Sequence, residues 1–293
     1  MEPDMTPSPN PKGCLFIVAT PIGNLSDITQ RAIDTLASAD LIAAEDTRHT
    51  KKLMAHLNLN TPLVAYHEHN DRDAMPELIR QLEGGKHIAL VSDAGTPLIS
   101  DPGYPLVAAA HSKGIRVSPI PGPCAAIAAA SASGLPTNDL HFIGFLPPKG
   151  NKREIAIEAL AKKPHSSVIY ESVHRIESLI KGLAKALEPN RPITIARELT
   201  KQYESIYTGC IADIAQDFNN KKVPIKGEFV VMVAPFENDQ DVDTLTLPKE
   251  ELLQKLLSTL PLREAVSLYC DISGDKRNAV YARALELTQR GQK

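Results

Sequence analysis

Residues 87–103, HIALVSDAGTPLISDPG, decide the predicted fold of this chain. The first five residues are apolar enough to form a short strand that is buried on both faces, and a polar turn, residues 92–97, follows directly. In an open α/β sheet, ligands bind in the crevice beyond the carboxyl ends of the strands. Gly95 lets the backbone approach a ligand closely, while Asp93 and Thr96 supply a carboxylate and a hydroxyl. Ordinary strand-to-helix turns have a similar composition, so this loop alone leaves a purely structural role open.

Strands and helices alternate along the first half of the chain. Apolar, β-branched runs predict strands at residues 14–19, 41–44, 63–66, 87–91 and 116–120. Helical periodicity predicts helices at residues 27–39 (capped by Asp27), 50–58, 74–82 and 106–112, and an alanine-rich helix after Cys124. This alternation predicts an α/β fold with a parallel, doubly wound sheet.

The length of 293 residues suits two domains and a small third one. A break at residues 147–151 (PPKGN) reads as an interdomain linker, and the apolar strands beyond it predict a second, mixed sheet. We therefore predict a disordered tail (1–12), an α/β domain (13–146), a second α/β domain (147–236), an acidic linker (237–248) and a helical module (249–293).

The predicted helical module has three short helices. The inward-facing positions are predicted to be Leu252, Leu253, Leu256, Leu257 and Leu260 on the first helix, Ala265, Leu268, Tyr269 and Ile272 on the second, and Val280, Ala284 and Leu287 on the third. Basic and hydrogen-bonding side chains of the third helix can face outward, as in a helix-turn-helix module that binds nucleic acid. A dimerisation or capping bundle is the alternative, because residues 261–293 hold six basic residues against four acidic ones, which is a small excess of positive charge.

Overall charge and cysteine usage narrow the class of protein. The net charge of −3 predicts no global attraction to nucleic acid, so RNA contacts must come from local patches. The four cysteines lie far apart without a CxxC pair, which favours a reducing cytoplasm. No apolar run approaches the length that spans a bilayer, and the N-terminal tail lacks the apolar core of a signal peptide.

Several common site motifs are missing from the sequence. The turn after the first strand holds only Gly23, so no GxGxxG dinucleotide motif forms there, and GxxxxGK[ST], GxSxG and HExxH are not found. His67, Glu68 and His69 lack a third ligand at standard spacing, so we predict a polar loop and no metal. Glu45 and Asp46 follow the second strand, where dinucleotide-binding α/β folds place the acid that binds the ribose. A nucleotide-dependent oxidoreductase therefore remains an alternative function.

What remains is a set of turns that carry proline and glycine but form no phosphate cradle. Such turns suit a ligand with a carboxylate, an amine and a nucleoside but no phosphate. S-adenosylmethionine is a ligand of that kind.

Six longer motifs occur in a fixed order. They are TPIGNLSDITQRA (20–32), AEDTRHT (44–50), LVSDAGTPLISDPG (90–103), PIPGPCAA (119–126), GFLP (144–147) and ARELTK (196–201). Together they resemble the tetrapyrrole-methylase-like superfamily and, within it, the ribosomal RNA small subunit methyltransferase I family. The resemblance covers about residues 13–290, and the N-terminal extension falls outside the family pattern.

The resemblance implies two α/β domains with S-adenosylmethionine in the cleft between them, usually in a homodimer. It implies methylation of the 2′-hydroxyl of a cytidine in the decoding region of 16S rRNA, in the small ribosomal subunit. The implied cofactor contacts are Pro21, Ser92, Asp93, Ala94, Gly95, Pro97, Pro121, Gly122, Cys124 and Ala125, and, across the cleft, Phe145, Leu146, Tyr170, Glu171, Ser172, Ala196, Arg197, Gly227 and Glu228. A loop that serves only the fold is the alternative for each group.

Methyl transfer to a ribose hydroxyl would benefit from a base or a cation near the oxygen, because that hydroxyl is a weak acid. The candidates are Glu45, Asp46, Arg48 and His49, which border the same crevice. The alternative is that Asp46 caps the next helix and that Arg48 pairs with it. Asp101 is a further candidate that could instead only shape its loop.

The predicted RNA contacts are Lys149, Lys152 and Arg153 at the linker and Lys276, Arg277 and Arg283 in the C-terminal module. Two rival functions fit the same residues. One is a C-methyltransferase that acts on a tetrapyrrole, and the other is a nucleic-acid-binding protein without enzyme activity.

Overall fold

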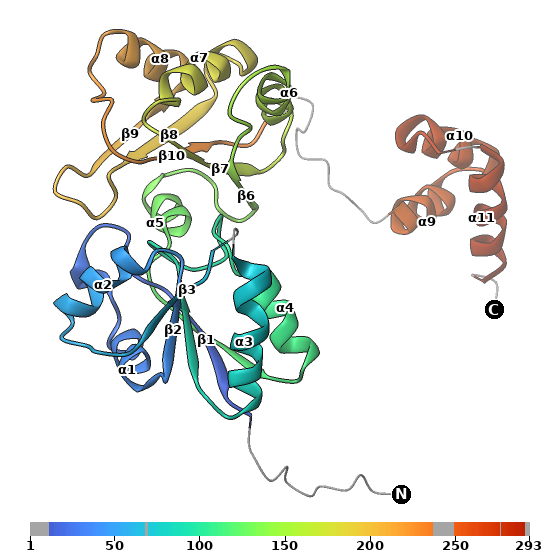
Figure 1. The fold of residues 1–293 in the computed structure, drawn as a ribbon. Coiled ribbons are helices and arrows are strands. Elements are labelled where there is room, and N and C mark those ends of the chain that lie inside the picture. The colour runs from blue at the N-terminus through green and yellow to red at the C-terminus, as the bar shows by residue number, and fades with distance from the viewer. Residues whose placement is uncertain (1–11, 68–69, 237–248, 276, 291–293) are drawn as a thin grey trace, which may run out of the picture. The chain divides into compact units, whose positions relative to one another are not determined.

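The computed structural model describes residues 12–67, 70–236, 249–275 and 277–290 (Figure 1). The chain divides after Phe236 into two compact units. Within the first unit, two five-stranded sheets define a first lobe (residues 12–124) and a second lobe (residues 125–236). The predicted tail (1–12, apart from Lys12) and acidic linker (237–248) lie outside the described residues.

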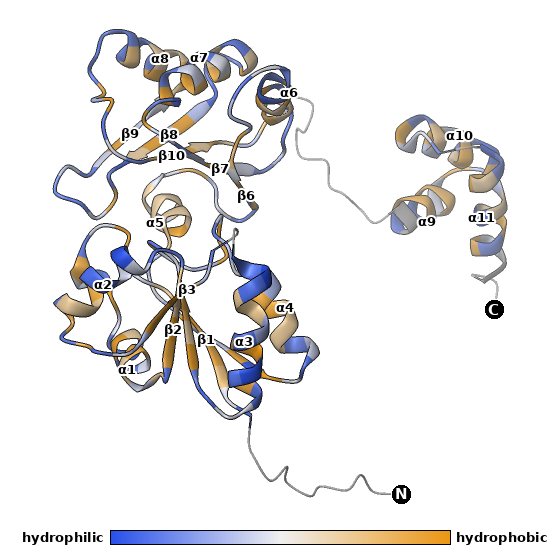
Figure 2. Cartoon of the chain, viewed as in Figure 1, coloured by the Kyte–Doolittle hydropathy of each residue, from blue (hydrophilic) through white to orange (hydrophobic). Residues whose placement is uncertain are grey.

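The sheet of the first lobe is entirely parallel, as the sequence predicts. Its strands are β1 (Cys14–Val18), β2 (Leu41–Ala44), β3 (Leu63–Ala65), β4 (Ile88–Val91) and β5 (Arg116–Ile120), in the order β3-β2-β4-β1-β5. All four residues of β4 are buried, and Figure 2 shows the strands of this sheet mostly in the orange of apolar residues. Because all five strands run the same way, their carboxyl ends share one edge of the sheet.

The helices of the first lobe are α1 (Gln30–Ser38), α2 (Thr47–His56), α3 (Asp71–Glu83) and α4 (Tyr104–Ser112), with a short 3-10 turn, η1 (Leu25–Asp27), before α1. The predicted cap of α1 is wrong. Asp27 ends η1, and the hydroxyl of Thr29 accepts the hydrogen bond from the N–H of Ala32 at 3.2 Å. Helix α2 also begins three residues earlier than predicted, because the Asp46 side chain accepts the N–H of Arg48.

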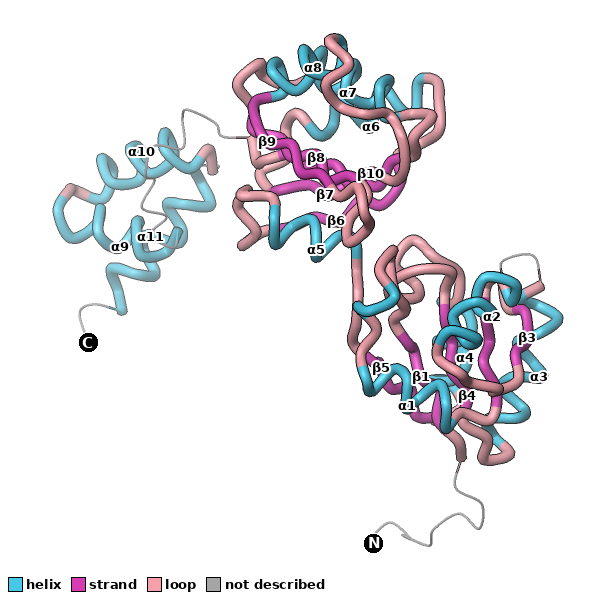
Figure 3. Tube along the Cα trace, turned by 90° about the vertical axis from the view of Figure 1, so that its left-hand side faces the viewer, coloured by secondary structure: helices cyan, strands magenta, loops and turns pink. Residues whose placement is uncertain are grey.

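The second lobe has a mixed sheet, again as predicted. Its strands are β6 (Leu140–Phe145), β7 (Ser166–Glu171), β8 (Pro192–Arg197), β9 (Ser205–Cys210) and β10 (Phe229–Val233), in the order β6-β7-β10-β8-β9. Strands β6 and β7 are parallel, whereas the other neighbours are antiparallel. Helices α6 (Asn151–Leu160), α7 (Ile176–Ala186) and α8 (Ile211–Asn219) pack on one face of this sheet (Figure 3).

The other face of the second sheet is covered by α5 (Ala125–Ala132), the helix that follows the last strand of the first sheet. Ala126, Ala129 and Ala130 pack against Val230 and Met232, and small side chains allow this close approach. Our predicted boundary at 146/147 assigned both α5 and β6 to the first domain, but both belong structurally with the second sheet. The remaining predicted domain boundaries stay predictions.

The second unit contains α9 (Lys249–Thr259), α10 (Leu262–Ser273) and α11 (Arg277–Arg290). Its core confirms the predicted inward positions of α11, since Val280 and Ala284 are buried. The predicted stripe on α10 is partly wrong, because Leu268 and Ile272 are 42% and 59% exposed. Val266 is buried in their place, so the packed face of α10 is rotated towards Val266 relative to the prediction. No helix in the described parts of the chain has the length and apolar character needed to cross a membrane.

Candidate active site

Three of the predicted cofactor turns are tied to one another at the carboxyl edge of the first sheet. The N–H of Thr20 donates to the carbonyl of Gly95 at 2.9 Å, and the N–H of Gly95 donates back to Thr20 at 3.0 Å. The hydroxyl of Thr96 donates to the carbonyl of Pro123 at 3.0 Å. Gly95 has a φ of +81°, and a Cβ there would lie 3.2 Å from a side-chain carbon of Ile22. The structure thus brings the turns after β1, β4 and β5 together.

The predicted contacts in these turns differ in accessibility. Pro21, Asp93, Ala94, Pro121, Gly122, Cys124 and Ala125 are exposed or half-buried, whereas Ser92, Gly95 and Pro97 are buried. A cavity of about 40 Å³ lies between the β1 turn, α2 and the β4 turn. Pockets that enclose a drug-sized ligand measure roughly 300–1,000 Å³, so a nucleoside ligand here must also lie against accessible groups outside the cavity.

Three of the predicted catalytic residues border these turns. The side chain of Glu45 accepts a hydrogen bond from the N–H of Asp93 at 3.3 Å, and Asp93 accepts one from the N–H of Asp46 at 3.1 Å. The turns after β2 and β4 therefore hold each other in place. His49 lies on the exposed side of α2 and lines the small cavity.

Asp46 and Arg48 take the structural role that is the alternative to catalysis. Asp46 is the N-cap of α2, and its second carboxylate oxygen pairs with Nη2 of Arg48 at 2.8 Å. Hydrogen bonds from the side chain and backbone of Arg48 hold the pKa of Asp46 well below its usual range. Capping and pairing thus give Asp46 and Arg48 a structural role, and their catalytic role stays a prediction.

An aromatic group of the second lobe faces the start of α5. The hydroxyl of Tyr170 accepts the N–H of Ala126 at 3.0 Å, which joins β7 to the N-terminus of α5. The Tyr170 ring lies 5.0 Å from Phe142 and 5.7 Å from Phe145, centroid to centroid. Burial raises the pKa of Tyr170 far above its usual value, so the phenol stays neutral. Phe145 is 54% exposed and is available to an apolar ligand surface.

Glu171 and Arg153 form part of a buried charge network rather than a ligand surface. Oε2 of Glu171 lies 2.6 Å from Nη2 of Arg153, and Oε1 lies 2.8 Å from Nε of Arg175. Arg153 is only 6% exposed and also donates to the carbonyl of Pro147. The prediction that Arg153 contacts RNA is therefore wrong, because α6 turns its guanidinium inward to neutralise Glu171. Ser172 contributes its N–H to the same carboxylate at 2.9 Å, and Leu146 is buried nearby in the core.

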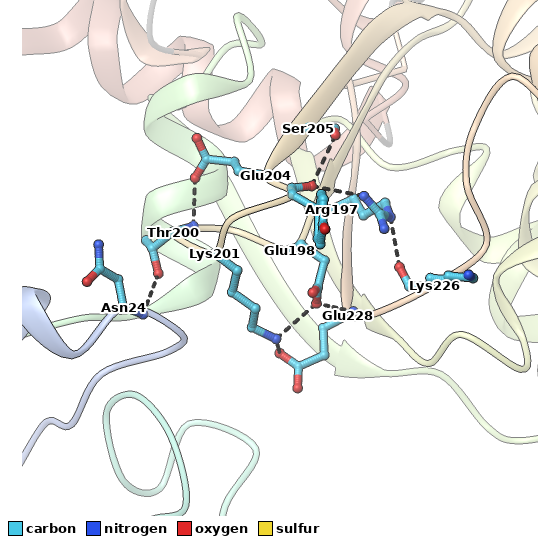
Figure 4. Close-up of polar contacts among 10 residues, drawn as sticks. Asn24, Arg197, Glu198, Thr200, Lys201, Glu204, Ser205, Lys226 and Glu228 are labelled. Atoms are coloured by element: carbon cyan, nitrogen blue, oxygen red, sulfur yellow. Dashed lines mark hydrogen bonds and ion pairs between the residues drawn. The ribbon is translucent and has the colours of Figure 1, made fainter.

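Figure 4 shows a second network, which contains two of the remaining predicted contacts, Arg197 and Glu228. Arg197 is buried, and its guanidinium donates to the carbonyls of Lys226 at 2.7 Å and of Tyr203 at 2.9 Å. The ammonium of Lys201 bridges Glu198 at 2.9 Å and Glu228 at 3.0 Å. Ala196 is buried as well, whereas the side chain of Glu228 is largely exposed. Of the predicted contacts on these loops, Glu228 is therefore the one that a ligand can reach most readily.

The same network contacts the first lobe. The N–H of Asn24 donates to the hydroxyl of Thr200 at 3.2 Å, and the Lys201 side chain lies against Gly23. Glu198 and Thr200 have φ angles of +51° and +64°, which are unusual for residues other than glycine. We did not predict a role for Glu198, Thr200 or Lys201, although all three stand in the quoted motif ARELTK. The motif was the available signal, whereas the strained backbone could not be read from residue types.

The other predicted RNA contacts lie on two separate units. Lys149 and Lys152 are exposed at the start of α6, next to a groove of about 670 Å³ between α6 and α7 that Lys181 and Lys185 also line. In the C-terminal unit Arg277 is exposed, and Nη1 of Arg283 pairs with Glu286 at 2.7 Å. Lys276, Glu68 and His69 lie outside the described residues.

Comparisons with known proteins agree with this architecture. A family model described as tetrapyrrole (corrin/porphyrin) methylases matches residues 14–215, and one described as the RsmI C-terminal HTH domain matches residues 249–288. Among solved structures, uroporphyrin-III-C-methyltransferase from Thermus thermophilus is similar with a TM-score of 0.53 and 19% identity, over 76% of this chain and 94% of that one. The cobalt precorrin-4 methyltransferase structure is similar with a TM-score of 0.56 and 16% identity, over 75% and 94% of the two chains. At these identities the structural likeness shows the fold alone.

Sequence relatives are much more similar. A protein of Vibrio cholerae serotype O1 named ribosomal RNA small subunit methyltransferase I is 47% identical over 284 residues, which cover 95% of this chain and 96% of the relative. A protein of Escherichia coli O157:H7 with the same name is 44% identical over 279 residues, or 94% and 96% of the two chains. The chain therefore belongs to the tetrapyrrole methylase family and, within it, to the ribosomal RNA small subunit methyltransferase I family.

Proposed function

We propose that this protein transfers a methyl group from S-adenosylmethionine to the 2′-hydroxyl of a cytidine in the decoding region of 16S rRNA. The coarser statement, that it is an S-adenosylmethionine-dependent rRNA methyltransferase, follows from its family. The finer statement, which names the ribose oxygen and its place in the rRNA, is the proposal. We place the reaction at the junction of the β1, β4 and β5 turns, because hydrogen bonds join these turns there and Tyr170 and Phe145 lie beside them.

The residues around this junction suit the proposed cofactor. Pro21, Ala94 and Gly122 leave accessible backbone at the ends of the strands, and no phosphate-binding motif follows β1. The exposed ring of Phe145 offers an apolar surface, and Asp93 offers a carboxylate to a hydroxyl or an amine. When bound, S-adenosylmethionine supplies a methyl group that its sulfonium has already activated. The protein then has to align the reacting atoms and exclude water.

The RNA would be held by exposed basic residues on both units. We keep Lys149 just before α6, Lys152 on α6, and Arg277 and Arg283 on α11 as proposed phosphate contacts. The helix-turn-helix module is the proposed RNA-binding element. Glu45, Asp46, Arg48 and His49 remain proposed catalytic residues that would contact the reacting ribose. A homodimer and a cytoplasmic location are also part of the proposal.

The direct test is transfer of a tritiated methyl group to small ribosomal subunits that lack the modification. We expect label in the 16S rRNA, on a cytidine whose ribose then resists alkaline cleavage and shows the added methyl mass on the sugar. Label on a base or on another RNA would contradict the proposal. Transfer to a tetrapyrrole but not to subunits would favour the rival C-methyltransferase.

The proposed RNA grip has its own test in the salt dependence of binding. Lys149→Ala and Lys152→Ala should each lower the slope of log affinity against log salt by roughly one. Lys222→Ala is the control, because Lys222 is exposed on the same lobe but pairs with Asp217. Equal slopes for all three variants would remove α6 from the RNA interface.

A further inference from the structure

The loop that follows the central turn is held in a conformation that ordinary residues avoid. Leu98 and Ser100 have φ angles of +71° and +68°, and Gly103 has one of +130°. A Cβ at Gly103 would lie 2.9 Å from a side-chain carbon of Leu90, so the loop is pressed against β4. Such backbone conformations persist only where the surrounding structure enforces them, and they cluster at functional sites. Asp101 stands in the middle of this loop.

The loop meets both lobes. Its Ser100 hydroxyl lies against Gly144 of β6, where a Cβ would be 2.7 Å from that oxygen. On the side of the first lobe, the Ser92 hydroxyl donates to the carbonyl of Ala94 at 3.3 Å, and the same hydroxyl acts on Asp101 by lowering the pKa of its carboxyl. A single hydroxyl proton serves one of these acceptors at a time. Asp101 is thus half-buried between the central turn and the second lobe.

The charges around Asp101 differ from those around three other carboxylates near the site. Asp46 is paired with Arg48, Glu171 with two arginines, and Glu198 with Lys201. Among the described residues no lysine or arginine forms an ion pair with Asp101, and the nearby ionisable groups are Asp93 on the central turn and Tyr170 on β7. Burial raises the pKa of Asp101, the Ser92 hydroxyl opposes this change, and the negative charge of Asp93 adds to it. Asp101 is therefore a stronger base than a carboxylate stabilised by a cation.

We propose that Asp101 is the general base that takes the proton of the ribose 2′-hydroxyl during methyl transfer, an assignment that rests on the proposed function. The ribose oxygen forms the new bond to the methyl carbon, and the carbon–sulfur bond breaks with its electron pair left on sulfur. The hydroxyl proton passes to the Asp101 carboxylate and then to water. The strained loop holds this carboxylate beside the turns that bind the cofactor, where a base is needed.

Asp101→Asn in the full-length protein tests the assignment. General-base catalysis contributes roughly 10²–10⁴-fold, so the single-turnover rate should fall by a factor in that range. The affinity for S-adenosylmethionine, measured by calorimetry, should change by less than about threefold. Asp34→Asn is the matched control, because Asp34 is an exposed aspartate on α1, and its rate should equal that of the wild type. Asp101→Glu, which keeps the carboxylate, should recover part of the lost rate.

Two pH measurements separate a base from a residue that only shapes the loop. The wild-type rate should rise with pH as Asp101 ionises, and Asp101→Asn should lose this dependence. In the carboxyl ¹³C spectrum of the protein without RNA, one aspartate resonance should titrate above the usual range and disappear in Asp101→Asn. The same resonance should also disappear in Asp101→Glu. This measurement does not depend on activity.

The proposal is overturned if Asp101→Asn retains turnover within threefold, or if its rate falls only in proportion to lost cofactor binding. It is also overturned if no such aspartate resonance exists, a result that stands even where Asp101→Asn fails to fold. Failure of the proposed function looks different, because the wild-type protein itself would then leave the ribose unmethylated.

Discussion

The two lobes of the first unit bury different kinds of polar side chain. In the first lobe the buried polar residues are hydroxyl-bearing, and they are Thr20, Thr35, Thr50, Ser92 and Ser118. In the second lobe, charged side chains are buried as well, namely Arg153, Glu171, Arg191 and Arg197. Among the described residues, every buried charge therefore belongs to the second lobe.

This difference follows from how each lobe fixes its loops. The first lobe joins its turns through backbone hydrogen bonds, as in the pair Thr20 and Gly95, through hydroxyls, and through the carboxylates of Glu45 and Asp93, which are not buried. The second lobe fixes its loops with buried ion pairs, such as those of Glu171 with Arg153 and Arg175. A buried charge whose partner is removed is costly, whereas a lost hydroxyl costs less. Substitutions should therefore affect stability most in the second lobe.

The largest effect on stability is expected for Glu171→Gln. It leaves the buried guanidinium of Arg153 without its counter-charge, and breaking a buried pair costs about 3–5 kcal/mol. The melting temperature should then fall by roughly 6–20 °C. The control is Glu77→Gln on α3, which removes the exposed partner of Arg80 and should leave the melting temperature almost unchanged. Equal shifts for the two variants would break the comparison between the lobes.

Gly227→Ala is expected to rank second. Gly227 has a φ of +84°, and an added Cβ would overlap the carboxylate of Glu198, which binds Lys201. Backbone strain and the displaced ion pair together should cost about 2–3 kcal/mol in urea unfolding. Gly134→Ala is a matched control, since Gly134 has a φ of +70° but no atom within 4 Å of the added Cβ. If the two alanine variants were equally stable, the network around Glu198 would contribute nothing.

In the first lobe, Thr29→Ala should cost about 1 kcal/mol, because it removes the hydroxyl that caps α1. Asp27→Ala serves as the comparison, since Thr29 and not Asp27 is the N-cap of α1. Unfolding by urea with both variants measures the difference. A larger loss of stability for Asp27→Ala would indicate that Asp27 caps α1, as the sequence predicts.

The smallest expected effect is a shift in acid stability. Burial opposes ionisation of Glu198, but hydrogen bonds from Lys201 and the Glu228 backbone and the charge of Lys201 together lower its pKa. A carboxylate with a lowered folded-state pKa stabilises the protein above the unfolded pKa of about 4.3, and this stabilisation is lost as the pH falls through the lower, folded-state pKa. As the pH falls from 6 into the acid range, the free energy of unfolding of Glu198→Gln should therefore decrease less than that of the wild type. Urea unfolding across this pH range measures the difference. An unchanged pH dependence would argue against the ion pair with Lys201.

Much of the candidate site could be predicted because its turns are local. The central turn, residues 92–97, carries its proline and glycine beside an apolar strand, and such a pattern needs no distant partner to be recognised. The ion pairs could not be predicted in this way. Arg153 and Glu171 are 18 residues apart, and residue types alone do not tell which of several basic side chains at the start of α6 turns inward.

The sequence by itself determined the order of strands and helices, the parallel first sheet and the family, because hydrophobic periodicity and contiguous motifs are local properties of the chain. Only the tertiary structure decided that α5 covers the second sheet, that Val266 rather than Leu268 is buried, and that Glu198 and Thr200 adopt positive φ angles. Each of these depends on contacts between residues far apart in the chain, where the free energy of packing outweighs local preference.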